Sequence, residues 1–95
     1  MDQPSPTQTY CQTEGILFNK IDADLVLMEP ASGKYFHINA IGARIWELIA
    51  TPRSFESIIA TLLSEYEVSR EQCEAEVTPF LQNAASKGFV TNVGE

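Results

Sequence analysis

The segment from Lys34 to Ile49, KYFHINAIGARIWELI, changes from a strand pattern to a helix pattern within a few residues. Its first part, through Ile38, is rich in aromatic and β-branched residues, which favour a partly buried strand. Asn39 follows as a good helix N-cap, because its side-chain oxygen can accept an unpaired N–H group of a first helical turn. Apolar residues then recur at helical spacing, at Ile41, Ile45, Leu48 and Ile49, with Trp46 beside them. The sequence therefore predicts strands and turns before Asn39 and helices after it.

Two more strands are predicted before this junction. Residues 16–21 (ILFNKI) and 25–29 (LVLME) are short apolar runs separated by a polar turn. Pro30 and Gly33 mark the next turn, since proline fixes φ near its start and glycine allows a positive φ near its end. The strands at 25–29 and 34–38 should therefore form an antiparallel hairpin.

The N-terminal residues show no such pattern. Residues 1–15 are polar, include Pro4 and Pro6, and have no long periodicity. We expect them to form mostly a flexible N-terminal arm, although 7–11 could add an edge strand.

The first two helices are expected at 40–50 and 55–65. Gly42 lies inside the first, where glycine costs about 1 kcal/mol relative to alanine. We therefore expect it to let another backbone approach closely. Ser54 can cap the second helix, whose apolar residues form a continuous stripe at Phe55, Ile58, Ile59, Leu62 and Leu63.

A third helix is predicted to begin at a capping box of Ser69 and Gln72, in which each side chain satisfies the other's backbone N–H. It should end at Gly88, because glycine can take the left-handed conformation that closes a helix, and residues 89–90 should fold back on the core. Pro79 interrupts this pattern, since proline in a helix interior costs about 3 kcal/mol. A kink and a break are both possible. A kink is favoured, because the apolar stripe keeps its phase across Pro79.

Size and composition limit what the chain can be. Ninety-five residues with 44% hydrophobic content make one domain with one modest core. There is no run of about 18 apolar residues and no secretory signal, so no membrane span is expected and the protein is assigned to the cytoplasm. Cys11 and Cys73 are too few for a disulfide framework and are expected to be reduced thiols.

The charge excludes two classes of partner. The formal net charge of −7 comes from thirteen acids against six bases, and the bases are scattered along the chain. Binding to nucleic acid or to an anionic membrane needs clustered cations, so neither partner is expected. The acids Glu71, Glu74 and Glu76 lie near the start of the third helix, where the helix dipole favours negative charge. This favours simple stabilisation over a docking role.

No catalytic or metal site is predicted. His37 is the only histidine, and no cysteine lies at metal-binding spacing from it. Asp22 and Asp24 belong to a turn, where acids are ordinary loop residues. Serine, cysteine and histidine form no nucleophile pattern, and phosphate-binding glycine loops are absent. We therefore expect no cofactor and no enzymatic activity, which leaves binding as the function.

A small sheet leaves at least one edge strand with unpaired N–H and C=O groups. If the strands lie in sequence order, that edge is the strand at 34–38. A guest peptide could extend the sheet there, gaining main-chain hydrogen bonds from the edge and specificity from flanking pockets. The alternative is that the N-terminal arm or the third helix already covers this edge.

Taken together, these residues resemble the PqqD-like family. The resemblance covers about residues 16–93 and is carried by the order and spacing of YFxIN, GAxIW, LLSEY, FL and KGFV. Members of that family are peptide chaperones, or recognition elements, of ribosomally made, post-translationally modified peptides. The combination of Tyr35, Asn39 and Trp46 is most similar to the stand-alone leader-binding proteins of lasso-peptide clusters.

The resemblance implies a winged-helix-like α+β fold, with a three-stranded antiparallel sheet followed by three helices. It also implies that a precursor's leader peptide binds by strand addition on the third strand, in the cleft made with the third helix. A separate leader peptidase or other maturation enzyme would then receive the peptide, and no cofactor is implied. The edge strand would supply Lys34, Tyr35, Phe36, His37 and Ile38. The helix wall would be drawn from Glu74, Val77, Thr78, Leu81 and Ala85.

Other functions fit parts of the sequence. A winged-helix DNA-binding regulator shares the architecture but would need a basic recognition helix, whereas the third helix carries three acids in its first half. A small enzyme would need a clustered acid–base pair or a metal set. A homodimer paired through the exposed strand is a further possibility.

Overall fold

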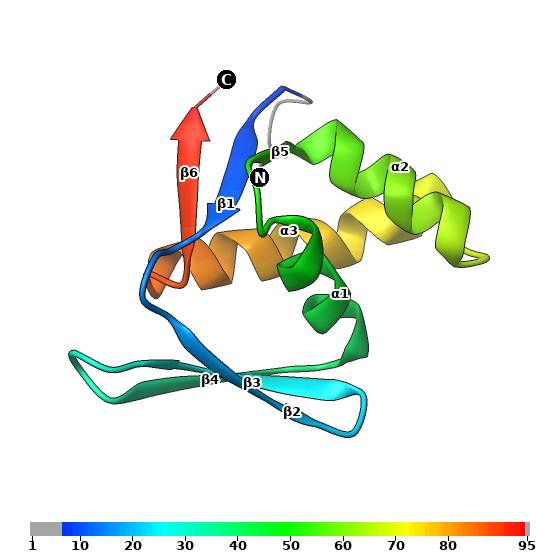
Figure 1. The fold of residues 1–95 in the computed structure, drawn as a ribbon. Coiled ribbons are helices and arrows are strands. Elements are labelled where there is room, and N and C mark those ends of the chain that lie inside the picture. The colour runs from blue at the N-terminus through cyan, green and yellow to red at the C-terminus, as the bar shows by residue number, and fades with distance from the viewer. Residues whose placement is uncertain (1–6, 95) are drawn as a thin grey trace.

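Residues 7–94 are described by the computed structural model, which has two three-stranded antiparallel sheets and three helices (Figure 1). One sheet has the order β2-β3-β4, built from Leu17–Ile21, Asp24–Glu29 and Lys34–Ile38. The other has the order β5-β1-β6, built from Arg53–Ser54, Thr9–Gln12 and Val90–Gly94. The helices are α1 (Ala40–Leu48), α2 (Phe55–Glu65) and α3 (Arg70–Ser86). The expected α+β fold, with a three-stranded antiparallel sheet followed by three helices, is confirmed.

The sheet β2-β3-β4 packs one face against the helices. Leu27 is fully buried on β3 and pairs with Phe36 on β4. Side chains alternate along β4, so Phe36 and Ile38 face the core whereas Tyr35 and His37 are exposed. The predicted hairpin of β3 and β4 is confirmed.

The second sheet corrects the expectation for the N-terminal residues. Thr9–Gln12 forms β1, which pairs with β5 on one side and with β6 on the other, and Tyr10 is buried in the core. These residues form a central strand, neither a flexible arm nor an edge strand. Residues 1–6 of the expected arm lie outside the described residues. The neighbours of β1 are hard to predict, because β5 has only two residues and β6 returns from beyond α3.

The three predicted caps start the three helices. The Oδ1 of Asn39 and the Oγ atoms of Ser54 and Ser69 accept hydrogen bonds from the N–H groups three residues on, at 3.0, 3.1 and 3.0 Å. Each cap satisfies one of the four N–H groups that a helix start leaves unpaired. Strand β4 therefore passes into α1 through a single residue, Asn39.

Helix α3 runs without interruption from Arg70 to Ser86, so Pro79 does not break it. Pro79 is exposed, which lets water reach the carbonyl that a proline cannot hydrogen-bond. After the helix, Gly88 has a φ of +87° and the Phe89 N–H donates to the Ala84 carbonyl at 3.0 Å. This is a Schellman ending, and it turns Phe89 back into the core, as expected.

Gly42 makes room for side chains rather than for a backbone. A Cβ atom at this position would lie 3.1 Å from Cε1 of Phe80 and 3.1 Å from Cβ of Ile38. The expectation that another backbone approaches Gly42 is therefore wrong. The lack of a side chain lets α1 lie close to the Phe80 ring of α3, beside the end of β4.

One hydrophobic core joins both sheets and all three helices. Tyr10 of β1, Leu27 of β3, Ile45 of α1, Ile59 of α2 and Leu81 of α3 all belong to it. None of the described helices is long and apolar enough to cross a membrane. Cys11 and Cys73 are free thiols, as expected.

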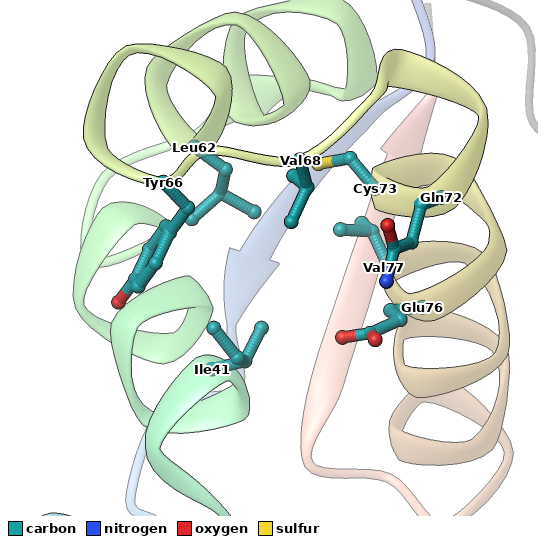
Figure 2. A pocket seen from close by; sticks show the side chains of 8 residues that line it. All are labelled: Ile41, Leu62, Tyr66, Val68, Gln72, Cys73, Glu76 and Val77. Carbon is teal, nitrogen blue, oxygen red and sulfur yellow. The ribbon is translucent and has the colours of Figure 1, made fainter.

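The helices leave a hollow where α1, the end of α2 and the start of α3 meet (Figure 2). It spans about 350 Å³ when the part open to solvent is included, and we call it the helix hollow. Burial raises the pKa of the Cys73 thiol, and the nearby carboxylates of Glu76 and Glu74 raise this pKa further. Cys73 is therefore a neutral wall residue. The lining residues are Ile41, Leu62, Tyr66, Val68, Gln72, Cys73, Glu76 and Val77.

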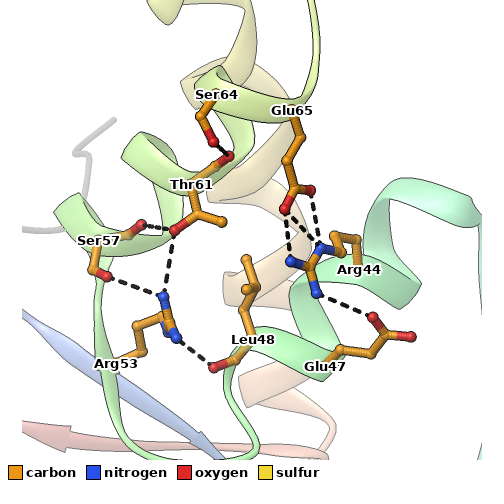
Figure 3. A network of polar contacts seen from close by, with 8 residues as sticks. All are labelled: Arg44, Glu47, Leu48, Arg53, Ser57, Thr61, Ser64 and Glu65. Carbon is orange, nitrogen blue, oxygen red and sulfur yellow. Dashed lines mark hydrogen bonds and ion pairs between the residues drawn. The ribbon is translucent and has the colours of Figure 1, made fainter.

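Two arginines tie α1 to α2 (Figure 3). Arg44 on α1 donates to Glu65 on α2 through Nε at 2.9 Å and through Nη2 at 2.6 Å. Arg53 donates through Nε to the Leu48 carbonyl at the end of α1, at 3.0 Å, and through Nη1 to Ser57 on α2, at 3.3 Å. A two-bonded arginine–carboxylate pair fixes geometry as well as charge, so these contacts set how the two helices meet.

Replacing Glu65 with glutamine should destabilise the fold at neutral pH but not in acid. The hydrogen bond from Arg44 lowers the pKa of the Glu65 carboxyl below its ordinary value of 4.5. An ionised carboxylate whose pKa is lower in the folded state stabilises that state. This stabilisation is complete at pH values above the unfolded-state pKa, and it is lost as the pH falls through the folded-state pKa. In thermal unfolding followed by circular dichroism, E65Q should melt below the wild type at neutral pH, and the gap should close as the pH falls below the ordinary carboxyl value of 4.5.

The matched control for this measurement is Glu67→Gln, which removes an exposed carboxylate from the connector between α2 and α3. It should melt like the wild type at both pH values. A gap for E65Q that does not change with pH would show that the Arg44 pair does not carry the effect.

Candidate functional site

Strand β4 has one open edge. It pairs with β3 along its length, and no strand within residues 7–94 pairs with its other side. Alternate residues of an antiparallel strand turn their N–H and C=O groups to each side, so the open edge presents a row of unpaired main-chain groups. The N-terminal strand β1, which could have covered this edge, lies in the other sheet.

Helix α3 runs alongside β4 in the opposite direction. At one end, Lys34 Nζ donates to the carbonyl of Lys87, just past the helix, at 3.1 Å. In the middle, the rings of Phe36 and Phe80 stack with their centroids 6.1 Å apart. At the far end, Glu76 lines the same groove as the last residues of β4. The strand edge and the helix therefore bound one elongated space.

This space, which we call the β4 groove, lies between β4, α1 and α3 and spans about 910 Å³ when the part open to solvent is included. The last part of β4 and Asn39 form one wall, the first half of α1 closes one end, and α3 forms the opposite wall. The lining residues are Phe36, His37, Ile38, Asn39, Ile41, Gly42, Ile45, Ala75, Glu76, Pro79, Phe80 and Asn83.

An aromatic cluster holds β4 against α3. Besides its contact with Phe80, the ring of Phe36 stacks on Phe89, with centroids 5.5 Å apart and an angle of 28° between the rings. Aromatic pairs contribute about 0.5–1.5 kcal/mol each beyond their buried area. The side chains of one face of β4 thus hold the strand in place without using its open main-chain edge.

Charged groups are sparse in the β4 groove. His37 Nε2 lies 3.2 Å from Asp24 Oδ2 on β3, and Glu76 is the one carboxylate among the lining residues. Within residues 7–94, no three His, Cys, Asp or Glu side chains lie together in a way that could hold a metal ion. What the groove offers is mainly main-chain hydrogen bonds and apolar contacts.

The five predicted edge residues all lie on β4, but they do not share one surface. Phe36, His37 and Ile38 line the β4 groove. Tyr35 is 71% exposed and lies on the face of the sheet that points away from the helices. Lys34 ties the start of β4 to the end of α3.

None of the residues predicted for the helix wall lines the β4 groove, and their contact with a peptide stays a prediction. Val77, Thr78 and Leu81 are buried in the core. Glu74 forms an ion pair within α3 at 2.7 Å. Neither these four residues nor Ala85 line the β4 groove. Their places are taken by residues of the other flank of α3, which sequence reasoning missed.

The geometry of a helix explains this difference. Successive residues turn by about 100°, so Glu76, Phe80 and Asn83 lie on one side of the buried line through Val77, and Thr78 lies on the other. The apolar stripe fixes the buried line, but it does not indicate which flank meets the neighbouring strand. Gly42 was the one feature of the sequence that could have indicated this flank. A glycine inside a helix leaves space for a large neighbouring side chain, and here that side chain is Phe80.

Comparisons with known proteins agree with this geometry. The family model for Coenzyme PQQ synthesis protein D (PqqD) matches residues 24–90. Among solved structures, TbiB1 in complex with the TbiA(beta) leader peptide is 28% identical in sequence to this chain. The match covers 90% of this chain and 99% of the TbiB1 chain, with a TM-score of 0.77. A lasso peptide synthetase B1 complexed with the leader peptide shares the fold at 24% identity, with 86% of this chain and 96% of its own covered and a TM-score of 0.74. A search of curated protein sequences gave no match.

The fold and the groove thus define a small α+β domain with an open sheet edge beside a helix. The chain belongs to the PqqD family, since the family model spans most of it. The matched residues include β3, β4 and all three helices, and therefore every element that forms the β4 groove.

Two substitutions test which flank of α3 faces the core. Leu81→Ala should lower the free energy of unfolding by about 2–5 kcal/mol, because it leaves a cavity among packed side chains. Asn83→Ala, on the exposed flank that faces the groove, should change it by less than about 0.5 kcal/mol. Urea unfolding followed by circular dichroism measures both changes. Equal, small losses for the two variants would place Leu81 outside the core.

Proposed function

We propose that this chain binds the leader segment of a ribosomally made precursor peptide as an added strand on β4, and presents it to a separate maturation enzyme. The observation that carries the proposal is the open edge of β4 beside the β4 groove. Membership of the PqqD family supports it. The 28% identical TbiB1, which is in complex with a leader peptide, supports it too.

A guest strand would use both parts of this site. Its main chain would hydrogen-bond to β4, and these bonds accept almost any sequence. Every second side chain would enter the β4 groove, between Phe36, Ile41 and Phe80, while the others would lie beside Tyr35 on the outer face. Burial of apolar guest side chains contributes about 25 cal/mol per Å², so the groove supplies the selectivity.

We assign the precursor to the lasso-peptide class. The support is the combination of Tyr35, Asn39 and Trp46, in which the chain is similar to stand-alone lasso leader-binding proteins. In the fold, Tyr35 is exposed beside the open edge, Asn39 caps α1 at the end of the groove, and Trp46 is buried under the sheet.

A maturation enzyme needs a surface that the guest peptide leaves free. The face of the sheet β2-β3-β4 that points away from the helices, which we call the outer face, offers one. It carries Leu17 and Ile21, which are 53% and 51% exposed, and a shallow hollow also lined by Val26, Met28 and Tyr35. Tyr35 belongs to β4, so this apolar face adjoins the guest strand. An enzyme held there would meet the bound peptide at a raised effective concentration.

The observations do not favour the alternative, a winged-helix DNA-binding regulator. Arg44 and Arg70 are engaged in ion pairs, and Arg53 donates to main-chain and hydroxyl oxygens. The exposed part of α3 carries Glu71 and Glu76. Together with a net charge of −7, this surface would repel phosphates.

A scan of single N-methyl groups along the leader should produce losses of affinity with a two-residue period. The leader is the segment encoded by the precursor gene nearest to the gene of this chain. Alternate N–H groups of an added strand face β4, so every second N-methyl group removes a hydrogen bond. Isothermal titration calorimetry should show losses of about tenfold at those positions. Losses without this period, or no saturable binding by about tens of micromolar, would contradict strand addition.

A filled groove is the control for this experiment. Ala75 lines the β4 groove, whereas Ala60 is exposed on α2 and lines neither the groove nor the helix hollow. Ala75→Trp should abolish leader binding, and Ala60→Trp should not. Far-ultraviolet circular dichroism should be native for both.

Light scattering of the free chain would detect a homodimer paired through β4. Such a dimer should dissociate when the leader binds, because the second protomer and the leader would use the same edge of β4.

Glutamate at Leu17 or Ile21 should prevent assembly with the leader peptidase and leave leader affinity unchanged. Both side chains are half exposed, so the substitutions cost little core packing, but they place a charge on the apolar outer face. Gel filtration with the peptidase encoded beside this chain measures the complex. Val93→Glu is the matched control, an equally exposed apolar residue on β6. A complex that survives both L17E and I21E would exclude the outer face as the docking surface.

A further inference from the structure

The helix hollow and the β4 groove are neighbours. Ile41 and Glu76 line both of them. Because α3 runs opposite to β4, with Lys34 next to Lys87 at one end, Glu76 lies at the other end, where β4 passes into α1. A peptide that leaves the paired stretch at that end would therefore pass directly over the helix hollow.

The helix hollow has apolar walls and a charged mouth. In Figure 2, the side chains of Leu62, Val68 and Val77 point inward, and the Glu76 carboxylate points from α3 toward Ile41 across the opening. The space is suited to a long aliphatic stem with a polar head that ends at its mouth.

Glu76 differs from most acids on the helices. Arg44 pairs with Glu47 and Glu65, and Arg70 pairs with carboxylates of α2 and α3. Glu76 is exposed and makes no ion pair or hydrogen bond within residues 7–94. It is also the only Asp, Glu, Lys or Arg among the residues that line the groove and the hollow. A single unpaired negative charge thus marks the junction of the two spaces.

We infer that Glu76 and the helix hollow select a basic residue of the bound peptide, a lysine or arginine placed just outside the stretch that pairs with β4. This inference rests on the proposed function and names one specificity-determining residue within it. The methylene stem would pack against Ile41 and Val77, and the cationic head would reach the Glu76 carboxylate. The net charge of −7 attracts a cation to this surface as well.

A purely apolar guest side chain would fit the walls of the hollow but not its mouth. It would displace water from the Glu76 carboxylate and give no partner in return, which is unfavourable. An acidic side chain would be repelled. The same carboxylate therefore favours one class of residue and disfavours two others, which is how a site becomes selective.

Parallel selections from one peptide library test this inference. The probe is a displayed library of random peptides of roughly 15 residues, long enough to pair with β4 and extend past it. The library is selected separately on the wild type, on Glu76→Gln and on Glu71→Gln. E71Q is the control, because it removes one negative charge, as E76Q does. Glu71 lies in the first turn of α3 and lines neither the β4 groove nor the helix hollow. Peptides selected on the wild type and on E71Q should share a lysine or arginine at one fixed position, and peptides selected on E76Q should not.

The strongest wild-type peptide then provides the quantitative readout. Replacing its basic residue by glutamine should cost roughly fivefold in affinity for the wild type and for E71Q, and nothing for E76Q. The difference should shrink as salt is added. Equal losses for the wild type and E76Q, or enriched peptides with no basic position, would overturn the inference and leave leader binding standing. If Ala75→Trp selects the same peptides as the wild type, the β4 groove is not the binding site, and both proposals fail.

Discussion

The stacking of Phe36 on Phe80 and Phe89 is the contact on which the groove depends. It joins β4 to α3 and to the turn after α3 through side chains alone. The strand is therefore held in place while the main-chain groups of its open edge stay unpaired. A strand fixed by main-chain hydrogen bonds on both sides would be equally rigid, but it would have no unpaired N–H and C=O groups to bind another strand.

Charges in this domain are placed away from that contact. Arg44 and Arg53 join α1 to α2, and Arg70 bridges carboxylates of α2 and α3. These ion pairs and hydrogen bonds join the helices to one another, and none of the three arginines lines the β4 groove. Of the Asp, Glu, Lys and Arg side chains, only Glu76 is among the residues that line the groove, at one end.

Local chemistry made much of the fold predictable. Asn39, Ser54 and Ser69 have side chains that suit only a few backbone positions, and each caps the helix that the sequence indicated. The run at 34–38 alternates and is bounded by turn residues on one side and a cap on the other, so its limits were correct. Such features are decided within a few residues of chain.

Long-range pairing was not predictable in the same way. Strand β1 exists because residues 53–54 and 90–94 meet it from distant parts of the chain, and none of these short runs forms a convincing strand alone. The flank of α3 that lines the groove depends on where β4 lies in space, which the stripe through Val77 does not encode. The open edge was predicted only on the condition that the strands lie in sequence order, and the sheet β2-β3-β4 has that order.

The pairing of β1 with β6 has a consequence for how this domain can be joined to other proteins. Thr9 and Gly94 are opposite each other in the ladder, so the described chain enters and leaves the fold at one place. That place is in the sheet β5-β1-β6, away from the sheet that carries β4 (Figure 1). A fluorescent reporter or an enzyme domain joined to the chain before Thr9 or after Gly94 would be attached at nearly the same place on the fold. Neither attachment would begin at the strand that a peptide has to reach.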